Sequence, residues 1–142
     1  MEVGFVYAVG AAIAWGLVYA IDLKILSDIS PMTLLFINSV ITAIIMLPFI
    51  FFNNGSIKDV FVSGKTSLSL IFISVILVTL ANFLILSGIK NLGASTASII
   101  EIAYPFFVVL FSFLLFRSTP NMYFFIGGAF LFVGLVIIIK FA

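Results

Sequence analysis

Five long apolar segments dominate this chain of 142 residues and constrain its fold more than any other feature. They cover residues 3–21, 32–52, 67–89, 94–116 and 122–141. A helix needs about 20 apolar residues to cross the hydrocarbon core of a bilayer, which is about 30 Å thick. Strands of a membrane barrel would instead alternate with a period of two, and the segments show no such alternation. The sequence therefore predicts an all-α integral membrane protein with five transmembrane helices.

Composition supports this environment and excludes several classes of function. Only 8% of the residues are charged, against about 25% in an average soluble domain, so the chain could not cover itself with polar surface in water. A net charge of +1 argues against nucleic acid as a partner. The sequence contains no Cys and no His, and it shows no nucleophile–base pair or metal-ligand cluster. We therefore expect no enzyme activity, no cofactor and no metal.

The basic residues are divided evenly between the two sides of the membrane. Five spans place the termini on opposite sides, so each Lys and Arg can be assigned to a side. Three lie on the N-terminal side (Lys58, Lys65, Arg117) and three on the other (Lys24, Lys90, Lys140). An excess of basic residues on the cytoplasmic side normally sets orientation. The tie leaves two interpretations open: other effects fix one orientation, or copies insert both ways and pair antiparallel.

A layer of polar residues is expected at one depth in the membrane. Glu101 lies about eight residues into the fourth segment, roughly 11 Å deep at 1.5 Å per residue. The same depth on the other segments falls near Trp15 (with Tyr19 one turn closer to the surface), Asn38, Asn82 and Gly134. Asn82 and Glu101 are equidistant from the turn between their segments. The Asn82 amide is therefore expected to bond the carboxylate if their faces agree.

Most members of this layer have a structural interpretation beside the functional one. Asn38 and Asn82 could serve only as interhelical hydrogen-bonding groups, and Trp15 and Tyr19 could serve only in packing. Glu101 differs, because an ionisable residue inside a membrane is functional by default. We expect Glu101 to bind and release a proton, with the other four residues forming a binding site around it.

One face of the fourth segment carries small residues. Ala94, Ala97, Ser98, Glu101 and Pro105 follow one another at spacings of three or four, so they share one side of a helix. Small residues let another helix backbone approach closely in lipid. Pro105 has no N–H for the carbonyl of Glu101, so a break in the helix is expected there.

The remaining polar and glycine positions are interpreted as structural. Gly127, Gly128 and Gly134 are expected to serve in packing. The charged residues that follow the first segment are expected at the water interface, with no role beyond solubility (Asp22, Lys24, Asp28).

Four stretches carry a resemblance to a known family. They are "AIAWGLVYAIDLKIL" (12–26), "ISPMTLLFINSVITAII" (29–45), "SGIKNLGASTASIIEIAYPFFVVLFSFLLF" (87–116) and "IGGAFLFVGLVII" (126–138). Their order resembles the EamA-like branch of the drug/metabolite transporter superfamily, and the resemblance covers nearly all of residues 1–142 as a single domain. Two positions depart from the family pattern. Ser118 stands where a glutamate is frequent, and Asn38 stands where an arginine is frequent. The missing arginine leaves no cation among the spans, so an anionic substrate loses its obvious partner.

The resemblance implies a transporter built from repeats. Members typically have ten spans in two five-span repeats of opposite orientation, and this chain resembles one repeat. A second, inverted copy would supply the other, as in the four-span small multidrug resistance proteins of the same superfamily. We expect a multi-pass protein of the cell membrane, in a prokaryotic inner or plasma membrane, that works as an antiparallel homodimer in the lipid bilayer.

The function expected from these observations is secondary transport of a small cationic or amphipathic metabolite or drug. Glu101 would couple transport to protons, and Trp15, Tyr19 and Tyr104 would offer aromatic faces to the solute. Alternating access would move the site between the two sides. Two alternatives stay open: a subunit of a lipid-linked carrier flippase, or a non-transporting half that pairs with a different five-span chain.

Overall fold

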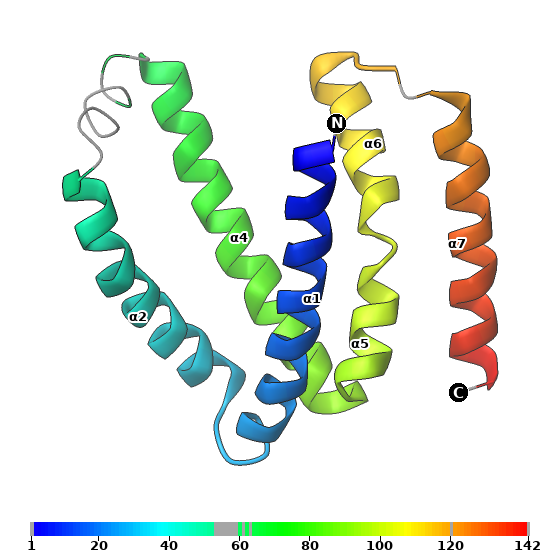
Figure 1. The fold of residues 1–142 in the computed structure, drawn as a ribbon, viewed down its shortest axis with the longest axis horizontal. Coiled ribbons are helices and arrows are strands. Elements are labelled where there is room, and N and C mark those ends of the chain that lie inside the picture. The colour runs from blue at the N-terminus through cyan, green and yellow to red at the C-terminus, as the bar shows by residue number, and fades with distance from the viewer. Residues whose placement is uncertain (1, 53–59, 61, 63, 120, 142) are drawn as a thin grey trace.

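The structure, a computed structural model, describes residues 2–52, 60, 62, 64–119 and 121–141. Its helices are α1 (Glu2–Ile25), α2 (Pro31–Phe52), α4 (Lys65–Leu92), α5 (Ala94–Glu101), α6 (Tyr104–Phe116) and α7 (Met122–Phe141). In this described part of the chain, five stretches are long and apolar enough to cross a membrane, with α5 and α6 together forming the fourth. The predicted all-α architecture is confirmed. The spans run alternately up and down, so the two termini lie at opposite ends (Figure 1).

The helix ends follow local hydrogen bonding. The Ser30 side chain accepts a hydrogen bond from the backbone N–H of Thr33 at 3.1 Å, as expected of a capping residue before α2. At the start of α7, Asn121 Oδ1 accepts from the N–H of Tyr123 at 3.2 Å. Asn121, the residue before α7, therefore caps this helix. The first helix also extends to Ile25, four residues beyond its predicted end.

Gly93 forms the whole connection between α4 and α5. Its φ of +83° lies in the region that favours glycine. Its N–H donates to the Ile89 carbonyl at 2.9 Å, and its carbonyl accepts from Ala97 at 3.1 Å. The two helices pack closely beside this turn, since a Cβ built on Gly88 would lie 3.7 Å from the Cβ of Ala97. The short connection thus produces a tight antiparallel hairpin.

The fourth span is broken between Glu101 and Tyr104. At the break, the N–H of Ala103 donates to Ile100 at 3.2 Å and the N–H of Phe106 donates to Ala103 at 3.1 Å, both with the tighter spacing of three residues. Pro105 stands in the first turn of α6 and has no N–H to continue the α-helical pattern. Glu101 is therefore the last residue of α5, at the point where the backbone changes course.

The packed core lies at one end of the molecule. It consists of Leu26, Leu34, Leu86, Ile89 and Ala97, which come from the connected ends of α1 and α2 and of α4 and α5. Lys90 strengthens the same end by donating from Nζ to the Ile29 carbonyl at 3.1 Å. Toward the other end, α2 and α4 diverge from α6 and α7 (Figure 1). Most large apolar side chains of the spans are exposed, as expected for surfaces that face lipid or another subunit.

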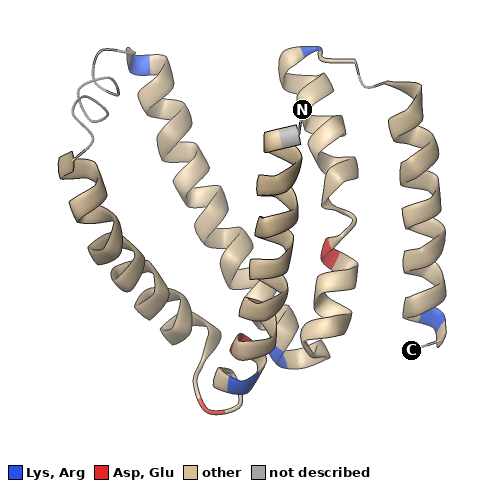
Figure 2. Ribbon diagram, viewed as in Figure 1, with Lys and Arg blue, Asp and Glu red and all other residues tan. Residues whose placement is uncertain are grey.

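Charged residues gather at the two ends of the helices (Figure 2). Lys65 opens α4 and Arg117 follows α6 at the N-terminal end. Lys24, Lys90 and Lys140 stand in the last turns of α1, α4 and α7 at the opposite end. Lys58 lies outside the described residues. Glu101 lies away from both ends, at the break in the fourth span (Figure 2).

Candidate functional site

A hydrogen bond between side chains far apart in the sequence joins α1 to α5. The Tyr19 hydroxyl donates to Glu101 Oε2 at 2.6 Å, and both side chains are half-buried. A hydrogen bond to an ionised carboxylate is stronger than one between neutral groups. The contact therefore connects the broken fourth span to the first helix at the level of the break.

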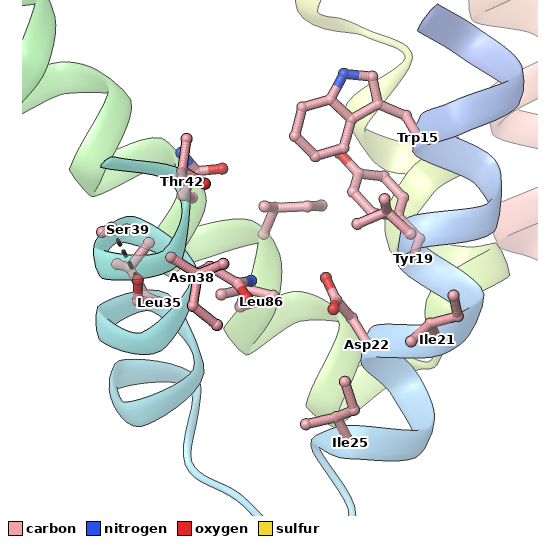
Figure 3. A pocket seen from close by; sticks show the side chains of 14 residues that line it. Trp15, Tyr19, Ile21, Asp22, Ile25, Leu35, Asn38, Ser39, Thr42 and Leu86 are labelled. Carbon is pink, nitrogen blue, oxygen red and sulfur yellow. Dashed lines mark hydrogen bonds between the residues drawn. The ribbon is translucent and has the colours of Figure 1, made fainter. Parts of the chain in front are cut away.

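A cavity of about 570 Å³ lies between α1, α2 and α4, next to this hydrogen bond. Its polar lining residues are Tyr19, Asp22, Asn38, Ser39, Thr42 and Asn82, and the ring of Trp15 adds an aromatic wall (Figure 3). The lining follows helical spacing. Trp15, Tyr19 and Asp22 occur at i, i+4 and i+7 on α1, which places them on one face.

Four residues predicted at one depth line this cavity together. Trp15 and Tyr19 form a tilted aromatic pair with ring centroids 5.6 Å apart and an interplanar angle of 52°. Asn38 lies across from them on α2 and Asn82 lies on α4. Glu101 is outside the lining and reaches the cavity only through Tyr19. The polar layer thus lines a cavity, and the Glu101 carboxylate lies behind the wall that Tyr19 forms.

The structure changes the expected partner of Glu101. Among the described residues, no hydrogen bond joins Asn82 to Glu101; the donor is Tyr19. Asn82 belongs to the cavity wall instead. Matched depth on neighbouring helices is therefore not sufficient for contact, because the two side chains leave their helices in different directions.

Asp22 is a functional candidate that the sequence interpretation missed. It was expected at the water interface, yet it is only 6% exposed and lines the cavity. The extension of α1 to Ile25 brings Asp22 inside the helix, so it no longer belongs to a surface connection. Its position one turn beyond Tyr19 was the signal that could have identified it.

The remaining candidates lie away from the cavity. Tyr104 is 60% exposed at the start of α6 and does not line it. Ala94 packs against the core cluster and Ala97 belongs to it. The Ser98 hydroxyl donates to the Ser95 carbonyl of its own helix at 2.9 Å.

The three glycines of α7 differ in their surroundings. A Cβ on Gly128 would come within 2.8 Å of Phe106 Cε1 on α6. At Gly127 and Gly134 a Cβ would meet nothing within 4 Å. Close packing within this chain is thus found at Gly128. For Gly127 and Gly134, packing stays a prediction, and it would involve a helix of another subunit.

Five apolar spans, three of which (α1, α2 and α4) line a partly polar cavity, define a multi-pass membrane protein. The family model of the EamA-like transporter family matches residues 2–140, and the chain belongs to this family. The resemblance seen in the sequence is thereby confirmed, and with it a general role in membrane transport. Neither a search of curated proteins nor a search of solved structures found a match.

Proposed function

We propose that this protein is a secondary transporter of a small cationic or amphipathic metabolite or drug, coupled to protons through Glu101. The observation that carries the proposal is the 2.6 Å hydrogen bond from Tyr19 to Glu101. Tyr19 also lines the cavity. One side chain therefore contacts both the carboxylate that would exchange a proton and the space that would hold the solute.

Protonation of Glu101 acts on the cavity through this contact. An ionised carboxylate only accepts hydrogen bonds, whereas the protonated acid has one O–H to donate and is a weaker acceptor. The Tyr19 hydroxyl is therefore held firmly in one state and loosely in the other. Its ring lies beside Trp15, so its movement alters the aromatic wall. A change in this wall gives the two protonation states different affinities for the solute. Coupling of transport to protons requires such a difference.

The cavity lining favours a cation over an anion. None of the residues that line it is basic, and Asp22 supplies a carboxylate. Trp15 and Tyr19 present aromatic faces that attract cations. Aliphatic side chains of α1, α2 and α4 complete the lining and suit an apolar body.

An inverted homodimer working by alternating access is the assembly that we propose. Two features support it. The core lies at one end of the molecule and the spans diverge toward the other (Figure 1), so an inverted copy would set its packed end beside the diverging end of the first. The even division of basic residues removes the usual barrier to insertion in both orientations.

Two other functions would use the same fold differently. A lipid-linked carrier flippase would need an opening toward lipid and would have less need of a titrating carboxylate. A non-transporting half would need a different five-span partner. The contact between Glu101 and the cavity wall favours the proton-coupled transporter, which would work in a prokaryotic inner or plasma membrane where a proton gradient is available.

Transport by purified protein in vesicles tests this proposal. Radiolabelled tetraphenylphosphonium and tetraethylammonium serve as probes, and an imposed pH gradient drives uptake. Glu101→Gln should reduce gradient-driven uptake to the level of protein-free vesicles, because the amide cannot exchange a proton. Glu101→Asp should retain part of the activity with an altered pH dependence.

The matched control is Asp28→Asn, which neutralises an exposed carboxylate at the Lys24 end of the molecule and should transport like the native protein. Size-exclusion elution verifies that each variant is folded. Native uptake by the Gln variant would overturn the coupling role of Glu101. Failure of the native protein to move either cation would overturn the proposed solute class.

A further inference from the structure

Asp22 is a buried carboxylate without a protein partner. Its side chain is 6% exposed, and no hydrogen bond or ion pair to it is found among the described residues. Among the described residues, no fully buried side-chain oxygen lacks a hydrogen bond, so the unpaired oxygens of Asp22 are open to the cavity that this residue lines. A carboxylate partly removed from water is stabilised by pairing with a cation. The space in front of Asp22 is therefore where such a partner can bind.

The surroundings of Asp22 are those of a binding site. Figure 3 shows its carboxylate directed from α1 into the cavity, toward α2 and α4. Asn38 and Asn82 lie on the other two walls, where their amide oxygens can accept hydrogen bonds from a solute. The Tyr19 and Trp15 rings stand about one and two turns before Asp22 on the same helix face. The nearest cation in the sequence, Lys24, is exposed and does not line the cavity.

We propose that Asp22 is the anchor for the cationic group of the solute, in a cavity bounded by Trp15, Tyr19, Asn38 and Asn82. The solute class is an organic cation with an ammonium, phosphonium or guanidinium group on an apolar body, and the cation supplies the partner that Asp22 lacks. This inference rests on the proposed transport function and divides its work between two carboxylates. Asp22 binds the solute, and Glu101 exchanges the proton behind Tyr19.

The division gives Tyr19 a definite position between the two groups. It lies one turn before Asp22 on α1, and its hydroxyl bonds Glu101 on α5. The other carboxylate at this end of α1, Asp28, is exposed beyond the helix. Bound cation and bound proton would therefore communicate through one aromatic side chain and not by competing for one carboxylate.

Equilibrium dialysis of radiolabelled tetraphenylphosphonium against the purified full chain in detergent tests the inference. Asp22→Asn should weaken binding at least about tenfold, because it removes the charge that pairs with the cation. Asp28→Asn, the same change at the exposed carboxylate, should bind like the native protein. Quenching of Trp15, the single tryptophan of the chain, should accompany binding in the native protein, since its ring lines the cavity.

Thermal unfolding distinguishes a binding role from a structural one. Without probe, Asp22→Asn should unfold at the native temperature or above it, because an unpaired buried charge is removed. With probe, the native protein should gain stability and the variant should not. A clear fall in the unfolding temperature of the variant without probe would assign Asp22 a structural role and overturn the inference.

Native affinity in Asp22→Asn would also overturn it. In that event Glu101→Gln is decisive for the proposed function. Loss of binding in Glu101→Gln would place the cation at Glu101 and leave proton-coupled transport standing. Absence of tetraphenylphosphonium binding to the native protein would overturn the anchor role of Asp22 and the cationic solute class together.

Discussion

At the scale of residues, Tyr19 has the most informative position. Its hydroxyl donates to Glu101 at 2.6 Å, while its ring lines the cavity beside Trp15. Tyrosine suits this position because an apolar ring and a polar hydroxyl are available on one side chain. Phenylalanine at this position would keep the aromatic ring in the cavity wall and lose the hydrogen bond to Glu101. The substitution therefore separates the packing role of Tyr19 from its contact with the carboxylate.

Tyr19→Phe should weaken the coupling of transport to the pH gradient. The variant keeps the ring in the cavity wall but loses the hydrogen bond that connects the wall to Glu101. A hydrogen bond to a charged group contributes about 1.5–3 kcal/mol, so we expect gradient-driven uptake to fall about tenfold. Uptake of tetraphenylphosphonium with and without an imposed pH gradient measures the loss.

Asn82→Leu is the comparison for this variant, since Asn82 lines the cavity without bonding Glu101. It should lower the affinity for the cation more than it lowers the response of uptake to the pH gradient. An unchanged response in Tyr19→Phe, or a larger loss in Asn82→Leu, would contradict the assignment of Tyr19 as the link between Glu101 and the cavity.

At the scale of elements, the broken fourth span and its contact with α7 organise half of the molecule. Phe106, in the first turn of α6, lies between Phe124 and Phe132 of α7, with ring centroids 6.5 and 6.4 Å away. The absence of a side chain at Gly128 makes room for the Phe106 ring. The helix break and this glycine together determine how α6 and α7 meet.

Gly128→Ala should destabilise the protein by about 1–3 kcal/mol, the usual cost of overpacking. The new Cβ would lie 2.8 Å from Phe106 Cε1, and the flanking rings restrict how far Phe106 can move. Thermal or denaturant unfolding in detergent measures the loss.

Gly127→Ala is the matched control, because a Cβ there meets nothing within 4 Å. It should be neutral or slightly stabilising, since Ala favours a helix more than Gly does. The double variant Gly128→Ala with Phe106→Leu should recover part of the lost stability. Equal stability of the two single variants would show that the Phe106 contact with Gly128 does not constrain the helices.

At the scale of the whole molecule, the distribution of basic residues and the position of the core bear on assembly. Lys65 and Arg117 lie at one end, and Lys24, Lys90 and Lys140 lie at the other. The core lies at the second end. The rest of the apolar surface is left to lipid or to another subunit.

Reporters fused to the C-terminus should show both orientations of the native chain. A fluorescent protein that folds only inside and an alkaline phosphatase active only outside should both give signal, because the basic residues favour neither side. Two Lys added to the connection between α2 and α4 should collapse the mixture to one orientation, with the C-terminus outside.

The opposite change is the control: Ser27→Lys with Asp28→Lys should place the C-terminus inside. A signal from one side only in the native chain would rule out dual topology and require a different partner for the proposed transporter. Cross-linking of the native chain in membranes would then show whether a parallel dimer replaces the inverted one.

Much of the architecture follows from the sequence alone because the membrane imposes strong local rules. Every backbone group must be bonded within its own span, so apolar length predicts the helices, and Pro105 marks the break in the fourth. Glu101 stands out as a carboxylate in an apolar run, and helical counting places Trp15, Tyr19, Asn38 and Asn82 near its depth. Each of these inferences needs only spacing along one helix.

The contacts between helices required the tertiary structure. Depth can be counted from a sequence, but direction around a helix axis depends on how the helices pack. Packing gave Glu101 the Tyr19 hydroxyl as its donor and placed Asn82 on the cavity wall. It also enclosed Asp22, which local counting had left at the surface. The reason is physical: burial and partner choice depend on neighbouring helices, and their relative rotation is not encoded in the apolar pattern of any single span.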